Sequence, residues 1–290
     1  MLTQHDTPVL SVCIPVYQGA EHLERTLHSV LEQEVRTPDG GMEVVVRDNA
    51  STDGSADVVA SFDDPRIRLE RATETVPMAE NWTRTIELAR GEFVKIVCAD
   101  DVVAPGSLAE QVERLRADPH LALAVGRTDM VDDTDRVLFA GRHLPRSILG
   151  TCDANDVLRT VVRHGGNPIG PPAAAMFRRA DFDAIGGLDP ELLFTMDLDL
   201  WVRLLRHGNL HGDRRTAAGF RIHPGSASAA TSKEQFATQR EFTRRLVASP
   251  YASIRKRDRA IGTVGSYAAL ARRYGLFVYG TLRRPADASA

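Results

Sequence analysis

An apolar run that ends in two carboxylates constrains the fold of this chain more than any other feature. The run begins after Gly91, Asp100 and Asp101 follow it, and Pro105 and Gly106 then break the pattern. An apolar run of this length, bounded by turn residues, is typical of a strand buried in a parallel sheet. Open α/β sheets bind ligands at the carboxyl ends of their strands, so the acid pair is a candidate to hold a divalent cation through oxygen ligands. The alternative is structural, with Asp101 as a helix cap or both acids solvated in a loop.

Strand and helix patterns alternate along the first half of the chain. Strands are expected at residues 9–16, 42–46, 67–71, 93–99 and 121–126. Apolar residues at helical spacing predict a helix in each interval between them. This alternation predicts an α/β fold with a mostly parallel central sheet flanked by helices. Farther along, helices are expected at 153–164, 196–207, 233–248 and 254–274, with a loop rich in Gly and Pro at 165–172.

The bulk composition excludes several classes of protein. Of the 290 residues, 43% are hydrophobic and 26% are charged, and the net charge is −3, which is typical of a globular protein without a general affinity for nucleic acid. The three cysteines are scattered. Cys13 and Cys98 fall in expected core strands, so we expect buried thiols in a reducing compartment. Residues 1–8 lack a signal-peptide pattern, and no apolar run has the length of a membrane span. We therefore expect a cytoplasmic protein. A peripheral position on the inner face of the membrane is the alternative.

Several short motifs occur in an order that resembles the family 2 glycosyltransferases with the GT-A fold. The motifs are Pro-Val-Tyr-Gln-Gly at 15–19, Asp-Asn-Ala-Ser-Thr-Asp-Gly-Ser at 48–55, Glu-Asn-Trp at 80–82, Gly-Glu-Phe at 91–93 leading to Ala-Asp-Asp at 99–101, Gly-Gly-Leu-Asp at 186–189, Asp-Leu-Asp-Leu-Trp-Val-Arg-Leu at 197–204 and Arg-Ile-His-Pro-Gly-Ser at 221–226. Each motif alone is weak, and their shared order carries the resemblance. We therefore expect a catalytic domain over 1–228, with a nucleotide-binding half at about 1–105 and an acceptor half at 106–228, and a helical C-terminal extension over 229–290.

The resemblance implies roles for particular residues of this sequence. The implied positions are Pro15, Tyr17, Glu21, Asp48 and Asp100 for the donor nucleotide, Asp100, Asp101 and His223 for Mg²⁺ or Mn²⁺ on the donor diphosphate, and Asp197, with Asp199 as the alternative, for the general base. The donor would be a UDP-, dTDP- or GDP-sugar, and the acceptor a saccharide, a lipid-linked molecule or a small molecule. Structural roles remain as alternatives, because Asp48 also suits a turn, Asp197 a helix N-cap and His223 an ordinary surface position. We expect Trp82 and Trp201 to be core anchors rather than platforms for a sugar.

Elementary chemistry agrees with these roles. Breaking a sugar–phosphate bond leaves negative charge on a diphosphate, which a bridging metal ion stabilises. The acceptor hydroxyl becomes a competent nucleophile when a positioned carboxylate takes its proton. One in-line attack assisted by one base inverts the anomeric centre, so the sequence predicts an inverting, metal-assisted transferase.

Three positions depart from the family pattern and keep two rivals open. Cys98 replaces the first acid of the usual metal motif, Met196 replaces the acid before the base, and Thr83 replaces an asparagine. One rival is a catalytically degenerate scaffold that still binds a sugar nucleotide. The other is a nucleotidyltransferase, which would normally carry a basic, glycine-rich phosphate loop where this chain has an acidic segment ending in Glu21.

The C-terminal region is basic. Residues 233–284 contain twelve Lys or Arg against three acids, with clusters at 255–257 and 272–273 near an apolar stretch at 276–279. Contact with an anionic membrane surface, a solvated helix face and a homodimer contact all fit this pattern. No nucleic-acid partner is expected, because the segment lacks a recognisable nucleic-acid-binding module.

Overall fold

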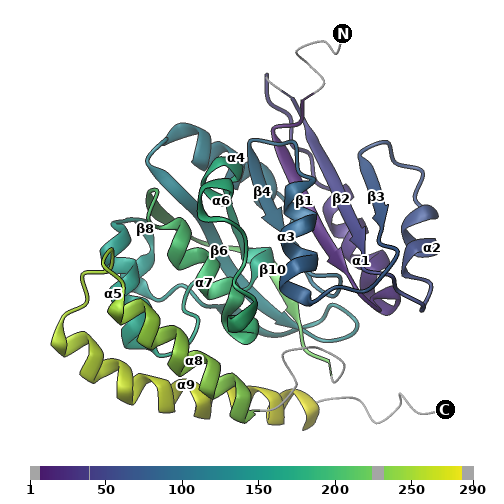
Figure 1. Ribbon diagram of the computed structural model, residues 1–290. Helices are drawn as coiled ribbons and strands as arrows, with labels where there is room; N and C mark the ends of the chain where they lie inside the picture. Colours follow the sequence, from purple (N-terminus) through teal and green to yellow (C-terminus); the bar gives the residue numbers. More distant parts are fainter. Residues whose placement is uncertain (1–6, 39, 224–231, 283–290) are drawn as a thin grey trace.

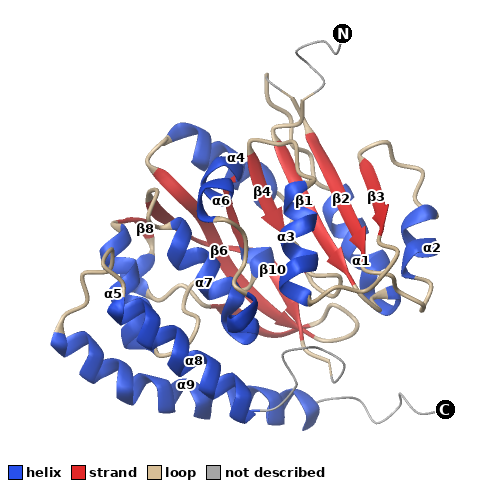
Figure 2. Ribbon diagram, in the orientation of Figure 1, coloured by secondary structure: helices blue, strands red, loops and turns tan. Residues whose placement is uncertain are grey.

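One sheet of ten strands organises the chain, and helices cover both of its faces (Figure 1). The computed structural model describes residues 7–38, 40–223 and 232–282. Strand order is β3-β2-β1-β4-β9-β6-β10-β5, with β7 added beside β6 and β8 beside β10. Figure 2 shows the strands as one continuous layer between helices, which is the arrangement that alternating strand and helix patterns predict.

The first half of the sheet is parallel, as predicted. Its strands are β1 (Leu10–Val16), β2 (Met42–Asp48), β3 (Ile67–Arg71) and β4 (Phe93–Ile96). Each of β1, β2 and β4 is buried along its whole length, which explains their continuous apolar runs. Pro15 is tolerated in β1 because the pairing with β4 ends at Cys13, so no partner there requires a backbone N–H. The carboxyl ends of these strands meet at one edge of the sheet.

The second half of the sheet is mixed. Its strands are β5 (Val102–Val103), β6 (Leu121–Val131), β7 (Val137–Arg142), β8 (Gly150–Cys152), β9 (Ala175–Arg178) and β10 (Asn209–Arg221). β6 and β10 are parallel to each other, and β9 joins the two halves by antiparallel pairing with β4 and β6. The mostly parallel arrangement therefore holds for the long strands, while the short strands run antiparallel to their neighbours. β10 brings its end, Arg221, to the same edge as β1 and β4.

Helices follow most of the strands at the predicted places. They are α1 (Ala20–Leu31), α2 (Ser55–Ala60), α3 (Met78–Glu87), α4 (Ser107–Ala117), α5 (Ala154–His164), α6 (Arg179–Ile185) and α7 (Met196–Leu204), with 3-10 turns η1 (Arg146–Ile148), η2 (Pro172–Ala174) and η3 (Pro190–Thr195). The expected cap of α5 is confirmed, because the Asp153 carboxylate accepts a hydrogen bond from Asn155 N at 2.9 Å.

Two C-terminal helices lie side by side, with α8 packed on η3 and α9 packed on α5 (Figure 1). α8 (Ser232–Ala248) places Phe242 and Leu246 in the main hydrophobic core. α9 (Lys256–Leu282) crosses α5 so closely that a Cβ on Gly262 would lie 2.4 Å from a carbonyl oxygen of α5 and one on Gly265 only 2.2 Å from another. The Arg163 side chain of α5 donates a hydrogen bond of 2.7 Å to the buried Asp258 carboxylate of α9.

The predicted membrane surface is described only in part. The cluster at 255–257 is exposed, whereas the side chains of residues 272–282 and the chain from 283 onward lie outside the described residues. No helix in the described part of the chain combines the length and the apolar character that a membrane span requires. The choice between membrane surface, solvated face and homodimer contact therefore stays open.

Candidate functional site

A cavity of about 1070 Å³ opens at the edge where the strands end. The predicted site residues that line it are Pro15, Tyr17, Glu21, Asp100, Asp197 and His223. They come from β1, α1, the loop after β4, α7 and the end of β10, so segments far apart in the sequence meet here. Sequence positions at strand ends thus converge on a single cavity, as expected for a sheet of this kind.

Three predicted residues lie outside the lining of this cavity. Asp48 is buried, its Oδ1 accepts a hydrogen bond from Ser51 N at 3.2 Å, and its neighbour Asn49 reaches the cavity instead. Asp199 pairs with Arg203, with Nε and Oδ2 2.6 Å apart, and burial raises the pKa of its carboxyl group. Asp101 lies directly behind the lining residue Asp100.

The acid pair lies on a tight loop rather than at the end of the strand. β4 ends at Ile96, so Cys98 lies in the loop and lines the cavity instead of the core, which corrects its expected place. Asp101 N donates to Cys98 O at 3.1 Å, and Thr26 Oγ1 donates to Asp101 O at 2.8 Å. Arg221 closes the loop from β10 by donating from Nε to Asp100 O at 2.8 Å and from its backbone N to Asp101 Oδ1 at 3.2 Å.

The side chains of this loop fit a hard divalent cation. Ligand atoms of Cys98, Asp100 and Asp101 lie within 4.8 Å of one another. Asp101 Oδ2 is buried and has no hydrogen-bond partner among the described residues. Burial and the neighbouring Asp100 raise the pKa of Asp101 well above its usual value, and the nearby Arg221 opposes this shift only in part. Burial and the nearby carboxylates also raise the pKa of Cys98, which keeps it a thiol and leaves the oxygen ligands to Asp100 and Asp101.

Two histidines complete this side of the cavity. His223 Nε2 lies 3.0 Å from Asp100 Oδ2. The His22 ring meets the His223 ring edge-on at 4.8 Å, and its buried Nε2 has no hydrogen-bond partner among the described residues. Burial and the nearby Arg221 lower the pKa of His22. Sequence reasoning missed His22, and its only signal was its position on the apolar face of α1.

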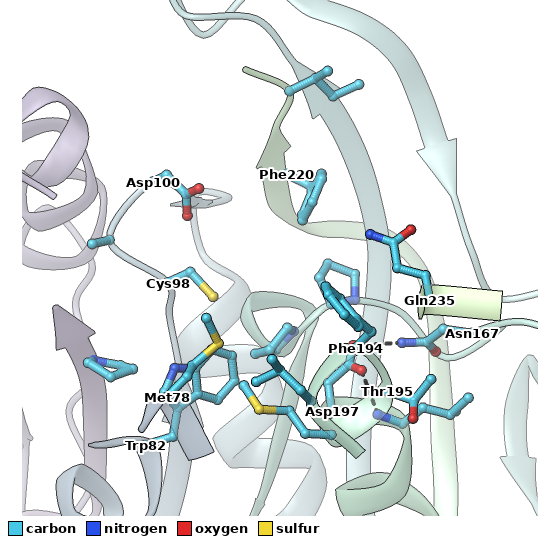
Figure 3. A pocket seen from close by; sticks show the side chains of 18 of the residues that line it. Met78, Trp82, Cys98, Asp100, Asn167, Phe194, Thr195, Asp197, Phe220 and Gln235 are labelled. Carbon is cyan, nitrogen blue, oxygen red and sulfur yellow. Dashed lines mark hydrogen bonds between the residues drawn. The ribbon is translucent and has the colours of Figure 1, made fainter. Parts of the chain in front are cut away.

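Asp197 occupies the floor of the cavity at the start of α7, and its carboxylate is held at both oxygens (Figure 3). Leu198 N donates to Oδ1 at 2.7 Å, and Asn167 Nδ2 donates to Oδ2 at 2.8 Å. Asn167 is itself fixed, because its Oδ1 accepts hydrogen bonds from Ile169 N and Gly170 N at 3.0 and 2.9 Å. The sequence placed Asn167 in a loop rich in Gly and Pro but did not indicate this contact.

The two tryptophans differ in their surroundings. Trp201 is fully buried and donates from Nε1 to Gly170 O at 3.2 Å, as expected of a core anchor. Trp82 is partly buried and packs against the core, as expected, and it also lines the cavity. Its ring lies on the α3 side of the site, near Met78 (Figure 3).

A family model described as "Glycosyl transferase family 2" matches residues 11–186. The chain belongs to this family. The match extends from β1 to the end of α6, includes the loop of Asn167 and ends before α7. The expected family membership is therefore confirmed.

Relatives in family 2 cover different shares of the chain. Uncharacterized protein MT1568 of Mycobacterium tuberculosis (strain CDC 1551 / Oshkosh) is 32% identical over 203 residues, which are 68% of this chain and 62% of that protein. Succinoglycan biosynthesis protein ExoO of Rhizobium meliloti (strain 1021) is 32% identical over 137 residues, which are 47% of this chain and 36% of that protein. The chain thus spans about a third to three fifths of the length of these two relatives.

Solved structures of glycosyltransferases confirm the GT-A fold. S. aureus TarS, solved in complex with UDP-GlcNAc, matches 92% of this chain and 73% of its own with a TM-score of 0.60 at 17% identity. Mannosyltransferase PcManGT from Pyrobaculum calidifontis, solved with GDP-Man and Mn²⁺, matches 95% of this chain and 80% of its own with a TM-score of 0.57 at 21% identity. The α/β architecture with helices on both faces of the sheet is the one predicted from the sequence.

The departure at Thr83 has a structural reason. Thr83 Oγ1 accepts a hydrogen bond of 3.1 Å from Leu188 N, next to Gly187, where φ is +86°. A Cβ at Gly187 would lie 2.9 Å from the Thr83 methyl carbon, so the two residues fit each other closely. In this family 2 chain, Thr83 therefore fastens α3 to the turn before η3.

Proposed function

We propose that this chain transfers a sugar from a nucleoside-diphosphate donor to an acceptor hydroxyl with inversion of the anomeric centre. The observation that carries the proposal is the shared cavity, which exposes the Asp100 carboxylate of a cation-compatible loop and the fixed Asp197 carboxylate to the same space. A diphosphate held at the first carboxylate places the sugar within the cavity that also holds the second.

The donor nucleotide would occupy the part of the cavity under β1 and α1. Pro15, Tyr17 and Glu21 line that part, and Tyr17 is 56% exposed, so its ring is available to a ligand. Asp48, behind the lining, would contribute through its Oδ2, which has no hydrogen-bond partner among the described residues and lies 3.8 Å from Arg71 Nε. The UDP-GlcNAc and GDP-Man of the two solved neighbours support this class of donor, and UDP, dTDP and GDP all remain candidates.

Asp100, Asp101 and His223 would hold Mg²⁺ or Mn²⁺. The donor set of carboxylate oxygens and one imidazole suits either ion. When bound, the cation stabilises the negative charge that grows on the leaving diphosphate. Arg221 fixes the loop by donating from its backbone N to the Asp101 carboxylate and from its Nε to the Asp100 carbonyl oxygen.

Asp197 is the better candidate for the base than Asp199. Asp199 is committed to Arg203 and lies outside the cavity lining, whereas Asp197 faces the cavity. The hydrogen bonds from Leu198 N and Asn167 fix the orientation of the Asp197 carboxylate. It would take the proton of the acceptor hydroxyl while that oxygen attacks the anomeric carbon from the side opposite the departing phosphate.

The test combines binding with turnover. Calorimetry with UDP, GDP and dTDP, each with and without Mn²⁺, should identify one nucleotide whose binding is tightened by the metal. With the matching donor, Asp197→Asn should lower turnover by about 10²–10⁴-fold, the range typical of a lost general base, while donor affinity stays within a factor of about two. Turnover that survives in Asp197→Asn refutes the assignment of the base. Nucleotide binding without turnover in the native protein would favour the degenerate scaffold instead.

Other parts of the proposal rest on the sequence. These are the boundary between the catalytic domain and the extension near residue 228, the cytoplasmic location, and contact with a membrane surface or a second copy through the basic segment. Exposed basic residues at 255–257 support the last of these, since both an anionic surface and an acidic patch would attract them.

A further inference from the structure

We propose that helices α8 and α9 complete the acceptor subsite, and that this subsite receives the uncharged, hydroxyl-bearing end of a saccharide. The inference rests on the proposed transferase function and names its acceptor class. It starts from the extent of the cavity, which continues beyond Asp197 to residues of the C-terminal helices.

The far part of the cavity has walls from three segments. The lining residues are His164, Gly165, Gly166 and Asn167 from the end of α5 and the following loop, Leu193, Phe194 and Thr195 from η3, and Gln235, Phe236, Gln239, Ser266 and Ala269 from α8 and α9. In Figure 3, Asp197 lies between the side of Cys98 and Asp100 and the side of Asn167 and Gln235. A hydroxyl group bound in the far part would therefore reach the Asp197 carboxylate.

This far wall carries no formal charge among its described lining residues. The twelve residues include no Asp, Glu, Lys or Arg. The charged lining residues Arg142 and Asp133 lie on other segments of the cavity, so a phosphate or carboxylate bound against this wall would lose its hydration and gain no counter-charge from the wall itself, which disfavours an anionic group. A neutral acceptor end fits this wall.

Amide and aromatic groups give the wall its specificity. Gln239 Nε2 is buried and has no hydrogen-bond partner among the described residues, so a donor is available for a ligand oxygen. Asn167, on the same side, already donates both amide hydrogens, to Gly170 O and Asp197 Oδ2, so it orients the Asp197 carboxylate rather than the ligand. The rings of Phe194 and Phe236 offer apolar faces beside these amides. A few amides within apolar walls suit the hydroxyl groups and C–H faces of a sugar ring.

The wall is held rigidly, so the subsite exists before the acceptor binds. Arg245 of α8 bonds Asp189 at 2.9 Å and Glu191 at 2.6 Å, on the turn that starts η3. Phe236 also packs against Tyr267 of α9, with ring centroids 5.7 Å apart. Because these contacts fix α8 against both η3 and α9, little ordering is needed on binding.

The experiment separates donor chemistry from acceptor recognition. Release of nucleoside diphosphate is measured with water as the only acceptor, then with neutral cello-, malto- and chito-oligosaccharides, and then with glycerol phosphate and glucuronate oligomers. We expect the neutral set to accelerate release. Gln239→Ala and Phe236→Ala should raise the acceptor KM by roughly 10-fold, the usual effect of one lost buried contact, without changing hydrolysis by water or donor affinity. Ala237→Ser, on the exposed side of α8, is the matched control and should behave as the native protein.

Each outcome decides one of the two proposals. If the native protein neither binds a donor nor hydrolyses it, the transferase function itself is refuted. If the donor is hydrolysed but only the anionic set, or neither set, accelerates release, the neutral-saccharide subsite is wrong. It is equally wrong if Gln239→Ala and Phe236→Ala leave the acceptor KM at the native value.

Discussion

The stability of this protein should rise with pH because of one buried lysine. Lys95 lies on β4 with no exposed surface, and its Nζ donates to Gln111 Oε1 at 2.6 Å, a neutral partner. Burial lowers the pKa of Lys95 from 10.5 to about 7. The folded protein therefore releases this proton near neutral pH, whereas the unfolded chain keeps it until about pH 10.

The sign and size of the effect follow from proton linkage. Between about pH 7 and pH 10 the unfolded state binds one more proton at this site, so the free energy of unfolding increases with pH. The slope is about 1.4 kcal/mol per pH unit, or roughly 3 kcal/mol between about pH 7.5 and pH 9.5. Lys95→Met removes the titrating group, and Lys95→Gln removes it while keeping a donor for Gln111.

Urea unfolding followed by tryptophan fluorescence at several pH values tests this reasoning. The stability of the native protein relative to Lys95→Met should increase across the window, and the two variants should differ from each other by a constant amount. If the free energies of unfolding of the native protein and Lys95→Met change with pH in parallel, the reasoning is refuted, because Lys95 would then have the same pKa in the folded and the unfolded state.

Two further substitutions test other parts of the architecture. Arg221→Met leaves the carbonyl oxygens of Asp100 and Asp132 without their donor, so it should lower the free energy of unfolding by about 3–5 kcal/mol in the same urea titration. Arg25→Ala is the control, because it removes only the more exposed ion pair to Asp135. It should lower the free energy of unfolding by less than about 1 kcal/mol. Phe242→Ala should lower the free energy of unfolding by about 3–5 kcal/mol, because this α8 side chain belongs to the main core. Unfolding of the variant should remain a single transition. A separate early transition would show instead that the extension folds on its own.

Continuous apolar runs made the first half of the fold predictable. β1 and β2 are buried on both faces, so their sequences carry the signal without knowledge of their partners. β10 was missed because it is polar and contains two glycines, and its strand conformation depends on the pairing with β6. β9 was also missed, because its four residues become a strand through antiparallel pairing with β4 and β6.

The site was predictable where a residue follows a strand or opens a helix, and less so elsewhere. Asp100 and Asp197 occupy such positions and line the cavity. Asp197 and Asp199 could not be separated by sequence alone, although residues two apart on a helix point in nearly opposite directions and only one of them can face the cavity. Asn167, Gln235 and Gln239 reach the cavity only because distant segments dock against each other, which no local pattern reports.

The two glycines of α9 have a consequence for how such enzymes diversify. Gly262 and Gly265 allow α9 to touch the backbone of α5, and Ser266 and Ala269 follow on the cavity wall. A single methyl group at either glycine would push the helix outward and widen the space beside Asn167 without altering any residue that faces it. The shape of this wall can therefore change through positions hidden behind it, which a comparison of lining residues alone would overlook.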